Sequence, residues 1–101
     1  MAGKHKQVVY SGIAHEQILT IMLFIAKKGY PDTSIKFCDE LYDFGSSLGS
    51  YPEKYAICHN NPFKKRNLRC APFKKFVFIY SVSEAAVTIL AIIHSSRLKS
   101  L

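Results

Sequence analysis

Residues 75–94 of the chain, KFVFIYSVSEAAVTILAIIH, contain two strongly apolar runs joined by a short polar turn. The β-branched and aromatic residues of these runs predict two strands, Lys75–Val82 and Ala86–Ile93, with the turn at Ser83–Ala85. Both alternating sets of side chains in the first run are apolar, so we expect apolar contacts on both faces of that strand. The stretch therefore predicts a hairpin inside a small sheet.

The alternation of side chains assigns a face to each residue of this hairpin. On the first strand it separates Phe76, Phe78, Tyr80 and Val82 from Val77 and Ile79. On the second strand it separates Val87, Ile89, Ala91 and Ile93 from Leu90, Ile92 and His94. Strict alternation along the second strand therefore predicts that His94 and Val87 lie on opposite faces.

A short strand and a long helix are predicted at the start of the chain. Lys6–Tyr10 is rich in β-branched and aromatic residues, which is typical of a strand, and Ser11 after it is a suitable N-cap. Between Ile18 and Ile25 apolar residues recur at helical spacing, and others widen the stripe beyond one side of the helix. Lys27–Gly29 supplies cations and a glycine that end the helix.

A second helix follows after a short break at Pro31. It is predicted from Ser34 to Leu48, with Asp32 or Thr33 as its N-cap. Because so few residues connect the two helices, they are expected to form an antiparallel hairpin.

The segment between the helices and the apolar hairpin is less regular. Ala56–His59 is a weak strand candidate, Asn60–Pro62 is a turn signal, Asn67–Cys70 is a strand candidate, and Ala71–Phe73 is a predicted break. The resulting order is β-α-α-β-β-β. We therefore predict one α+β domain over residues 1–101, in which a helical hairpin packs on a small, mainly antiparallel sheet.

Composition and charge narrow the possible partners. The chain has a net charge of +7 and no apolar stretch near the roughly 20 residues that span a bilayer. A small basic domain typically meets nucleic acid, an acidic protein or an anionic surface, although lysines also serve solubility alone. With no recognisable signal peptide, a soluble cytoplasmic protein without a membrane partner is expected.

The cysteines are three in number, Cys38, Cys58 and Cys70, and they lack the paired spacing of a metal or redox motif. An odd number without CxxC spacing favours reduced thiols in a reducing compartment. Scattered histidines give no zinc pattern, so we predict neither a metal site nor a cofactor.

The element order and several residues together carry a resemblance. The matching residues are an opening strand that leads into Ser11 and Ala14, a strand carrying Leu68 and Arg69, and the runs Lys75–Val82 and Val87–His94, which close on Arg97. In this arrangement the chain resembles the ParE/RelE superfamily of bacterial type II toxin–antitoxin toxins. The resemblance covers nearly the whole chain and is most specific from Leu68 to Arg97.

The resemblance implies two possible activities. RelE-like members bind the ribosomal A site and cleave mRNA, whereas ParE-like members inhibit DNA gyrase without known catalysis. In both branches a cognate antitoxin binds the toxin with an acidic segment, and only this complex binds operator DNA. The ending His-x-x-Arg at His94 and Arg97 favours the ParE-like branch. A RelE-like ribonuclease, a decayed toxin and a non-toxic basic nucleic-acid-binding module remain alternatives.

Candidate site residues follow from these activities. Under the ribonuclease alternative, Arg69 would stabilise the charge of the phosphate and His94 would transfer protons. Each also has a structural interpretation: His94 could bond backbone at a sheet edge, and Arg69 could pair with Glu84 or stack on Tyr80. The predicted nucleic-acid-binding cations are Lys64, Lys65, Arg66, Lys74, Lys75 and Arg97. The predicted antitoxin-binding residues are Phe76, Phe78, Tyr80, Ile21 and Ile25, with the aromatic stripe alternatively part of the core.

Overall fold

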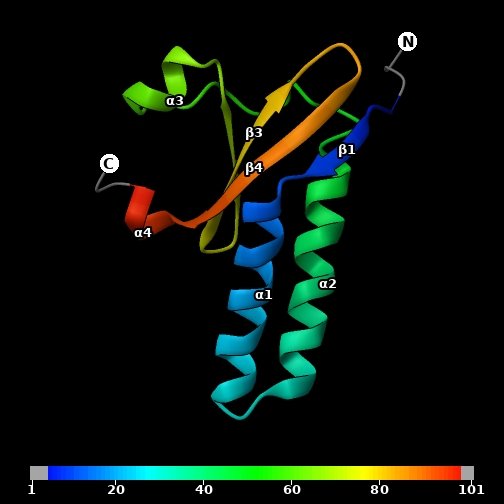
Figure 1. Cartoon of the computed structure of the whole chain (residues 1–101), viewed down its shortest axis with the longest axis vertical. Helices are drawn as coiled ribbons and strands as arrows, with labels where there is room; N and C mark the ends of the chain where they lie inside the picture. The colour runs from blue at the N-terminus through cyan, green and yellow to red at the C-terminus, as the bar shows by residue number, and fades with distance from the viewer. Residues whose placement is uncertain (1–4, 99–101) are drawn as a thin grey trace.

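A computed structural model of the protein describes residues 5–98 as one sheet with helices on both of its faces (Figure 1). The elements are β1 (Gln7–Tyr10), α1 (Gly12–Lys27), α2 (Pro31–Ser47), α3 (Asn61–Lys65), β2 (Arg69–Phe73), β3 (Phe76–Val82), β4 (Ala86–His94) and α4 (Ser95–Leu98). The strand order is β1-β4-β3-β2, with β1 parallel to β4 and the other pairs antiparallel. The predicted α+β class with a helical hairpin on a mainly antiparallel sheet is confirmed.

The junction between β1 and α1 is fixed by one serine. Ser11 Oγ accepts a hydrogen bond from Ala14 N at 3.0 Å, which makes Ser11 the predicted N-cap of α1. The same hydroxyl donates to Leu90 O at 2.8 Å, and the Ser11 amide donates to Ile89 O at 2.9 Å. Ser11 therefore ties the start of the first helix to the middle of β4.

The second helix begins earlier than predicted. It starts at Pro31 after Tyr30, and neither Asp32 nor Thr33 is the N-cap. The fixed φ of proline suits the first turn of a helix, where the missing amide hydrogen has no intrahelical partner to lose. Proline therefore initiates α2, and Asp32 lies in its first turn, where a carboxylate complements the helix dipole.

The predicted break at Ala71–Phe73 is wrong, because these residues belong to β2. β2 is an edge strand next to β3, and the amide of Cys70 points outward to Ala56 O at 3.2 Å. Pro72 has the same orientation as Cys70 in the alternating backbone, so its missing N–H points away from β3 and costs no bond in that ladder. An edge strand can accept a proline where a central strand could not.

Two further differences concern short elements. The predicted strand Ala56–His59 is wrong, since this part of the chain contributes only an isolated bridge between Ile57 and Arg69. The predicted turn and cationic segment after it fold into α3, with Pro62 in the first turn. A short helix, α4, also follows β4 directly. Both helices are too short for hydrophobic periodicity to identify them.

The sheet separates two apolar cores. On the face covered by α1 and α2, the buried core residues are Ala14, Ile18, Leu41, Leu48, Ala71, Phe78, Tyr80, Val87, Ile89 and Ile92. On the other face a smaller core of Cys58, Leu68, Val77 and Ile79 packs with Phe63 of α3 and Leu98 of α4. The prediction of apolar contacts on both faces of β3 is confirmed. We call the smaller group the second core.

A β-bulge changes the faces of β4. Ile79 pairs with Ala91 and Tyr80 pairs with Ile89, which leaves Leu90 without a partner on β3. Leu90 and Ala91 both contact the second core, and Ile92 returns to the helical face. The predicted strict alternation is therefore wrong from Ala91 onward. The extra residue moves the end of β4 by one position, so that His94 and Val87 share the helical face.

Gly45 of α2 marks the closest approach of this helix to the sheet. A Cβ at this position would overlap the hydroxyl of Tyr10 and lie 2.9 Å from Ile89 Cδ1. The Tyr10 hydroxyl donates to Tyr42 O at 2.9 Å, so it is not free to move away. Glycine is required here by packing and not by backbone conformation.

The substitution Gly45→Ala is expected to lower the free energy of unfolding by about 1–3 kcal/mol, as overpacking of a core does. This loss would outweigh the gain in helix propensity of about 1 kcal/mol. Gly12→Ala is the matched control, because nothing lies within 4 Å of a Cβ there. Urea denaturation of both variants measures the effect, and equal stabilities would contradict the packing argument.

Candidate functional site

A cavity of about 670 Å³ lies where α1, the end of β4 and α4 meet. The residues that line it are Gln17, Thr20, Ile21, Phe76, Ile92, Ile93, His94, Ser96 and Arg97. Its walls combine apolar side chains with the imidazole of His94 and the guanidinium of Arg97. The predicted pair at the end of the last strand therefore borders one concave site, which we call the β4-end cavity.

The backbone edge of β4 is open beside this cavity. β1 pairs with β4 only as far as Ile89, so the strand continues past the end of its neighbour. Gln17 of α1 takes the place of a strand there, because its Oε1 accepts a hydrogen bond from Ile92 N at 2.6 Å. Sequence analysis did not identify Gln17, since a single glutamine on a helix gives no signal of this role.

His94 lies against the helical face of the sheet. Its ring contacts that of Phe76 edge to face, with centroids 5.4 Å apart, and its Nδ1 is 2.8 Å from Ser96 Oγ. Both contacts hold the imidazole at the rim of the β4-end cavity, where the side chain stays exposed. The predicted alternative, a bond between His94 and a backbone group, is present as well, since Ser96 N donates to His94 Nδ1 at 3.2 Å.

Arg69 has a structural role at a different corner of the sheet. Its Nη1 donates to Tyr55 O at 2.6 Å, which fixes the loop that follows α2. Across the ladder from Arg69 lies Tyr80, whose hydroxyl donates to Pro52 O at 2.8 Å. The predicted pairing of Arg69 with Glu84 is wrong, because its guanidinium binds a carbonyl of the same loop that Tyr80 holds.

Arg69 and His94 do not share a site. Arg69 pairs with Tyr80 of β3, and His94 pairs with Phe76 at the other end of the same strand. Four residues at a rise of about 3.3 Å each separate them by roughly 13 Å along β3, and they lie on opposite sides of that strand. General acid–base catalysis needs both groups within hydrogen-bonding reach of one phosphate, which this arrangement does not provide.

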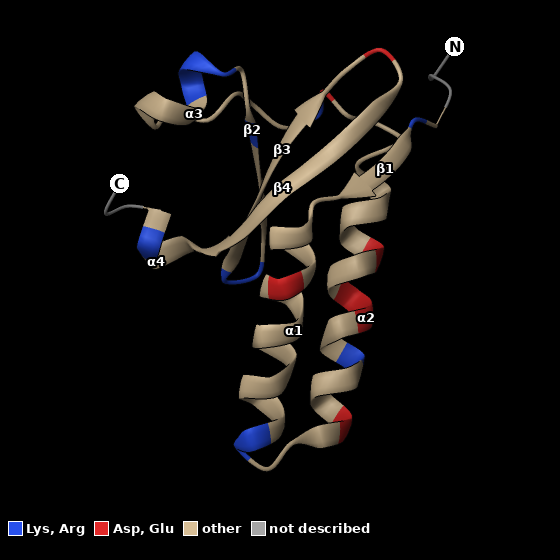
Figure 2. Cartoon of the chain, viewed as in Figure 1, with Lys and Arg blue, Asp and Glu red and all other residues tan. Residues whose placement is uncertain are grey.

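The cations fall into separate groups, as Figure 2 shows. Lys64, Lys65 and Arg66 are exposed on and directly after α3, and Arg97 is exposed on α4. Acidic side chains instead lie along the length of α2. The helical hairpin and the α3–α4 side of the sheet therefore differ in charge.

Lys74 departs from the predicted nucleic-acid-binding set. Its Nζ donates to Glu40 Oε1 of α2 at 2.7 Å, and the same ammonium lies over the rings of Phe37 and Phe73. The bond from Lys74 lowers the pKa of Glu40. Lys74 is therefore directed toward the acidic helix, while Lys75 remains exposed in the turn directly before β3. An exposed pair of this kind contributes little to stability.

Two of the predicted antitoxin-binding residues are wrong. Phe78 and Tyr80 are 0% exposed, so they offer no surface to a partner, and the alternative of a core role is confirmed for both. Phe76, Ile21 and Ile25 are half-buried, and the first two line the β4-end cavity. Burial by α2 could not be seen in the strand pattern, because both faces of β3 are apolar.

An exposed apolar surface on α1 contains none of the residues that the sequence predicted for a site. Ile13, Leu19, Leu23 and Phe24 are each half or more exposed. Phe24 is one turn from Thr20 on the helix, so this apolar surface continues from the β4-end cavity. The sequence signal was the width of the apolar stripe, which exceeds what one sheet face can cover. We call these four residues the α1 apolar face.

The cysteines differ from the prediction of reduced thiols. Cys58 and Cys70 form a disulfide across the loop that contains α3, and Cys38 is free. The prediction failed because a spacing of 12 residues resembles no motif, and only the return of the chain beside β2 brings the two sulfur atoms together. Among residues 5–98, no helix is long and apolar enough to cross a membrane, and no three potential metal ligands cluster.

Comparison with known proteins gives a structural match only. No family model and no curated protein sequence matches the chain. Among solved structures it is similar to a chain of the "Chromosomal ParDE TA system from P. aeruginosa", with a TM-score of 0.75 and 13% sequence identity. The superposition covers 89% of this chain and 96% of that chain. The fold is therefore ParE-like over most of the chain.

The Tyr80 hydroxyl provides a test of the Arg69 corner. Burial raises the pKa of Tyr80 to about 12, although the charge of Arg69 acts in the opposite direction. The ordinary pKa near 10 applies to the unfolded chain, so this stabilising contribution is complete below pH 10 and is lost as pH rises to 12.

We expect Tyr80→Phe to be less stable than the wild type by about 1 kcal/mol at pH 7, because Pro52 O loses its donor. Between pH 10 and 12 the wild type should lose about 2 kcal/mol that the variant does not lose. Chemical denaturation across this pH range measures the difference. Tyr51→Phe is the control, since Tyr51 is 59% exposed, and a constant difference between wild type and Tyr80→Phe would contradict the assignment.

Proposed function

We propose that this chain is the toxin of a type II toxin–antitoxin module, which blocks growth by ParE-like inhibition of DNA gyrase. The observation that carries the proposal is the nearly end-to-end structural similarity to a chain of a ParDE system. The ending with His94 and Arg97 favours the ParE-like branch. Both residues line the β4-end cavity, which supports the proposal that they act in one site. The protein would act in the cytoplasm, where gyrase is found.

Gyrase inhibition is favoured over mRNA cleavage by the positions of Arg69 and His94. A ribonuclease needs a proton-transfer group and a cation at one phosphate. Here the guanidinium of Arg69 is bonded to Tyr55 O and lies along β3 from His94 by roughly 13 Å. The RelE-like alternative would therefore need Arg97 in place of Arg69, since Arg97 borders the same cavity as His94.

The cognate antitoxin is proposed to bind along the α1 apolar face and into the β4-end cavity. Exposed apolar side chains of this number on one helix are typical of a surface that a partner covers. Lys27 and Lys28 lie at the end of the same helix, and Arg97 lies at the cavity, so cations stand at both ends of the surface. An amphipathic acidic segment matches this combination of apolar centre and basic ends.

Growth and topology assays test the activity. Expression without the neighbouring antitoxin gene is expected to arrest growth, and the purified chain is expected to inhibit supercoiling of relaxed plasmid by gyrase. Primer extension on a translated reporter mRNA should show intact transcripts in the arrested cells. Breaks within codons that need translation would instead support the ribonuclease, and normal growth would contradict a toxin of either kind.

Leu23→Asp tests the antitoxin surface. Leu23 is 51% exposed, so the fold should tolerate the change, whereas a buried carboxylate in the complex should weaken antitoxin binding by at least about 2 kcal/mol. Tyr51→Asp is the matched control, because Tyr51 is 59% exposed on the loop after α2. Calorimetry with the product of the neighbouring gene measures both, and equal affinities would remove the α1 apolar face from the proposed interface.

A further inference from the structure

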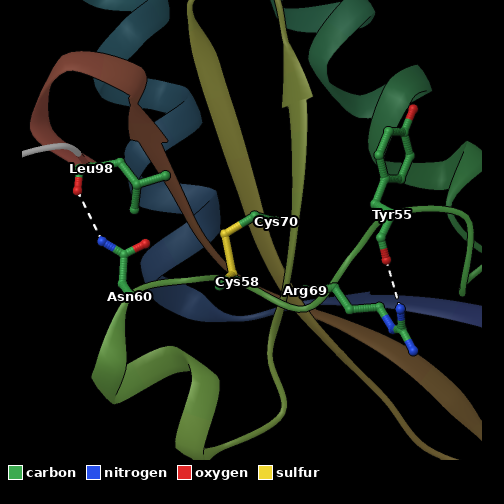
Figure 3. The surroundings of a disulfide bond; sticks show 6 residues. All are labelled: Tyr55, Cys58, Asn60, Arg69, Cys70 and Leu98. Carbon is green, nitrogen blue, oxygen red and sulfur yellow. Dashed lines mark hydrogen bonds between the residues drawn. A yellow bond between two sulfur atoms is a disulfide. The ribbon is translucent and has the colours of Figure 1, made fainter.

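The disulfide Cys58–Cys70 closes the loop that carries α3 and its cations. Figure 3 shows the bond at the base of this loop, with Asn60 and Leu98 on one side and Arg69 with Tyr55 on the other. Short backbone bonds accompany it, from Cys58 N to Leu68 O at 2.8 Å and from Cys70 N to Ala56 O at 3.2 Å. The cross-link therefore holds the segment before α3 against the edge strand β2.

The same cross-link supports α4 indirectly. Asn60, the residue before α3, donates from Nδ2 to Leu98 O at 3.1 Å, and the side chain of Leu98 packs on the second core (Figure 3). Phe63 of α3 packs on that core as well. Since Arg97 precedes Leu98 on α4, the disulfide is linked through Asn60 and Leu98 to one wall of the β4-end cavity.

Apart from the disulfide and the second core, few contacts hold α3 and α4: Leu68 N donates to Phe63 O at 3.0 Å, and Ser95 N donates to Lys75 O at 2.8 Å. They contain five and four residues, and helices of this length have no stability of their own. The second core contains four buried residues, and one of them is Cys58 itself. Among residues 5–98 the single salt bridge is Lys74–Glu40, so the three neighbouring cations Lys64, Lys65 and Arg66 have no bound carboxylate. Their mutual repulsion opposes the closed loop.

We propose that Cys58 and Cys70 are a thiol–disulfide switch, in which the oxidised pair holds α3 and α4 against the second core and a dithiol reductant releases them. Cys58 is 2% exposed and Cys70 is half-buried, so a reductant reaches Cys70 more readily. Cys38 packs against the core on the helical face of the sheet, which prevents it from exchanging into the pair.

Reduction of the Cys58–Cys70 disulfide by a dithiol transfers two electrons from the dithiol to the protein. A thiolate of the dithiol attacks Cys70 Sγ, and the bonding pair of the disulfide leaves with Cys58 as a thiolate, which takes a proton from water. The second thiol of the reductant then attacks the mixed disulfide and releases Cys70, while the reductant becomes a disulfide. Oxidation by the oxidised form of such a dithiol reverses both steps.

Hydrogen exchange of the whole chain tests the switch without reference to its activity. After reduction with dithiothreitol, amides of residues 59–69 and 95–98 are expected to exchange about tenfold faster or more, while α1 and β3 keep their protection. The double variant Cys58→Ser/Cys70→Ser should exchange rapidly without reductant. Cys38→Ser is the matched control and should respond like the wild type.

Two results would overturn the switch. Unchanged exchange after complete reduction would mean that the second core holds α3 and α4 without the bond. Loss of protection throughout the chain would mean that the disulfide stabilises the whole domain and not a local segment. If the double variant does not fold, hydrogen exchange of the wild type during titration with dithiothreitol and after reoxidation is sufficient to decide between these outcomes.

The consequence for activity rests on the proposed function. The oxidised chain is expected to inhibit gyrase several-fold more strongly than the reduced chain, because Arg97 and the cations of α3 are then held in place. Equal inhibition by the two forms would overturn this consequence. If neither form inhibits gyrase, the proposed function fails, whereas the exchange experiment still decides whether the switch exists.

Discussion

The pairing of β3 with β4, including its bulge at Leu90, is the constraint on which the rest of the structure depends. The two strands are buried between the helical hairpin and the second core, so their side chains define both cores. The bulge shifts the end of β4 by one residue and turns His94 toward α1. Without it, alternation would place His94 on the opposite face, and the β4-end cavity would lose its imidazole.

This arrangement leaves backbone polar groups at the edge of β4 without a neighbouring strand, and the start of α1 supplies their hydrogen-bond partners. β1 is too short to cover the whole strand, and Ser11 and Gln17 bind Leu90 O and Ile92 N where it does not reach. Buried backbone groups without partners would destabilise the sheet by about 1–3 kcal/mol each. The helix therefore stabilises the open edge with the same residues that position it beside the cavity.

Charge and apolar surface are separated across the molecule in a way that fits a protein with two kinds of partner. The α1 apolar face is exposed on the helical hairpin, whereas the cations on and directly after α3 lie toward the other side of the sheet (Figure 2). Arg97 lies at the β4-end cavity, next to α1. An antitoxin that covers the α1 apolar face and the β4-end cavity would leave the cations of α3 accessible. The disulfide lies on the α3 side, so a change in its redox state would act on the cations of that side and, through Asn60 and Leu98, on the Arg97 wall of the β4-end cavity, and not on the α1 apolar face.

The sequence by itself determined β1, both long helices, the hairpin of β3 and β4, and the ending at His94 and Arg97, because these features follow from local periodicity, capping and turn chemistry. The tertiary structure alone decided the bulge at Leu90, the distance between Arg69 and His94, the burial of Phe78 and Tyr80, and the Cys58–Cys70 bond. Each of these depends on which segments, distant in sequence, lie side by side. No local pattern encodes that, since a two-sided apolar strand and a cysteine pair 12 residues apart are compatible with several arrangements.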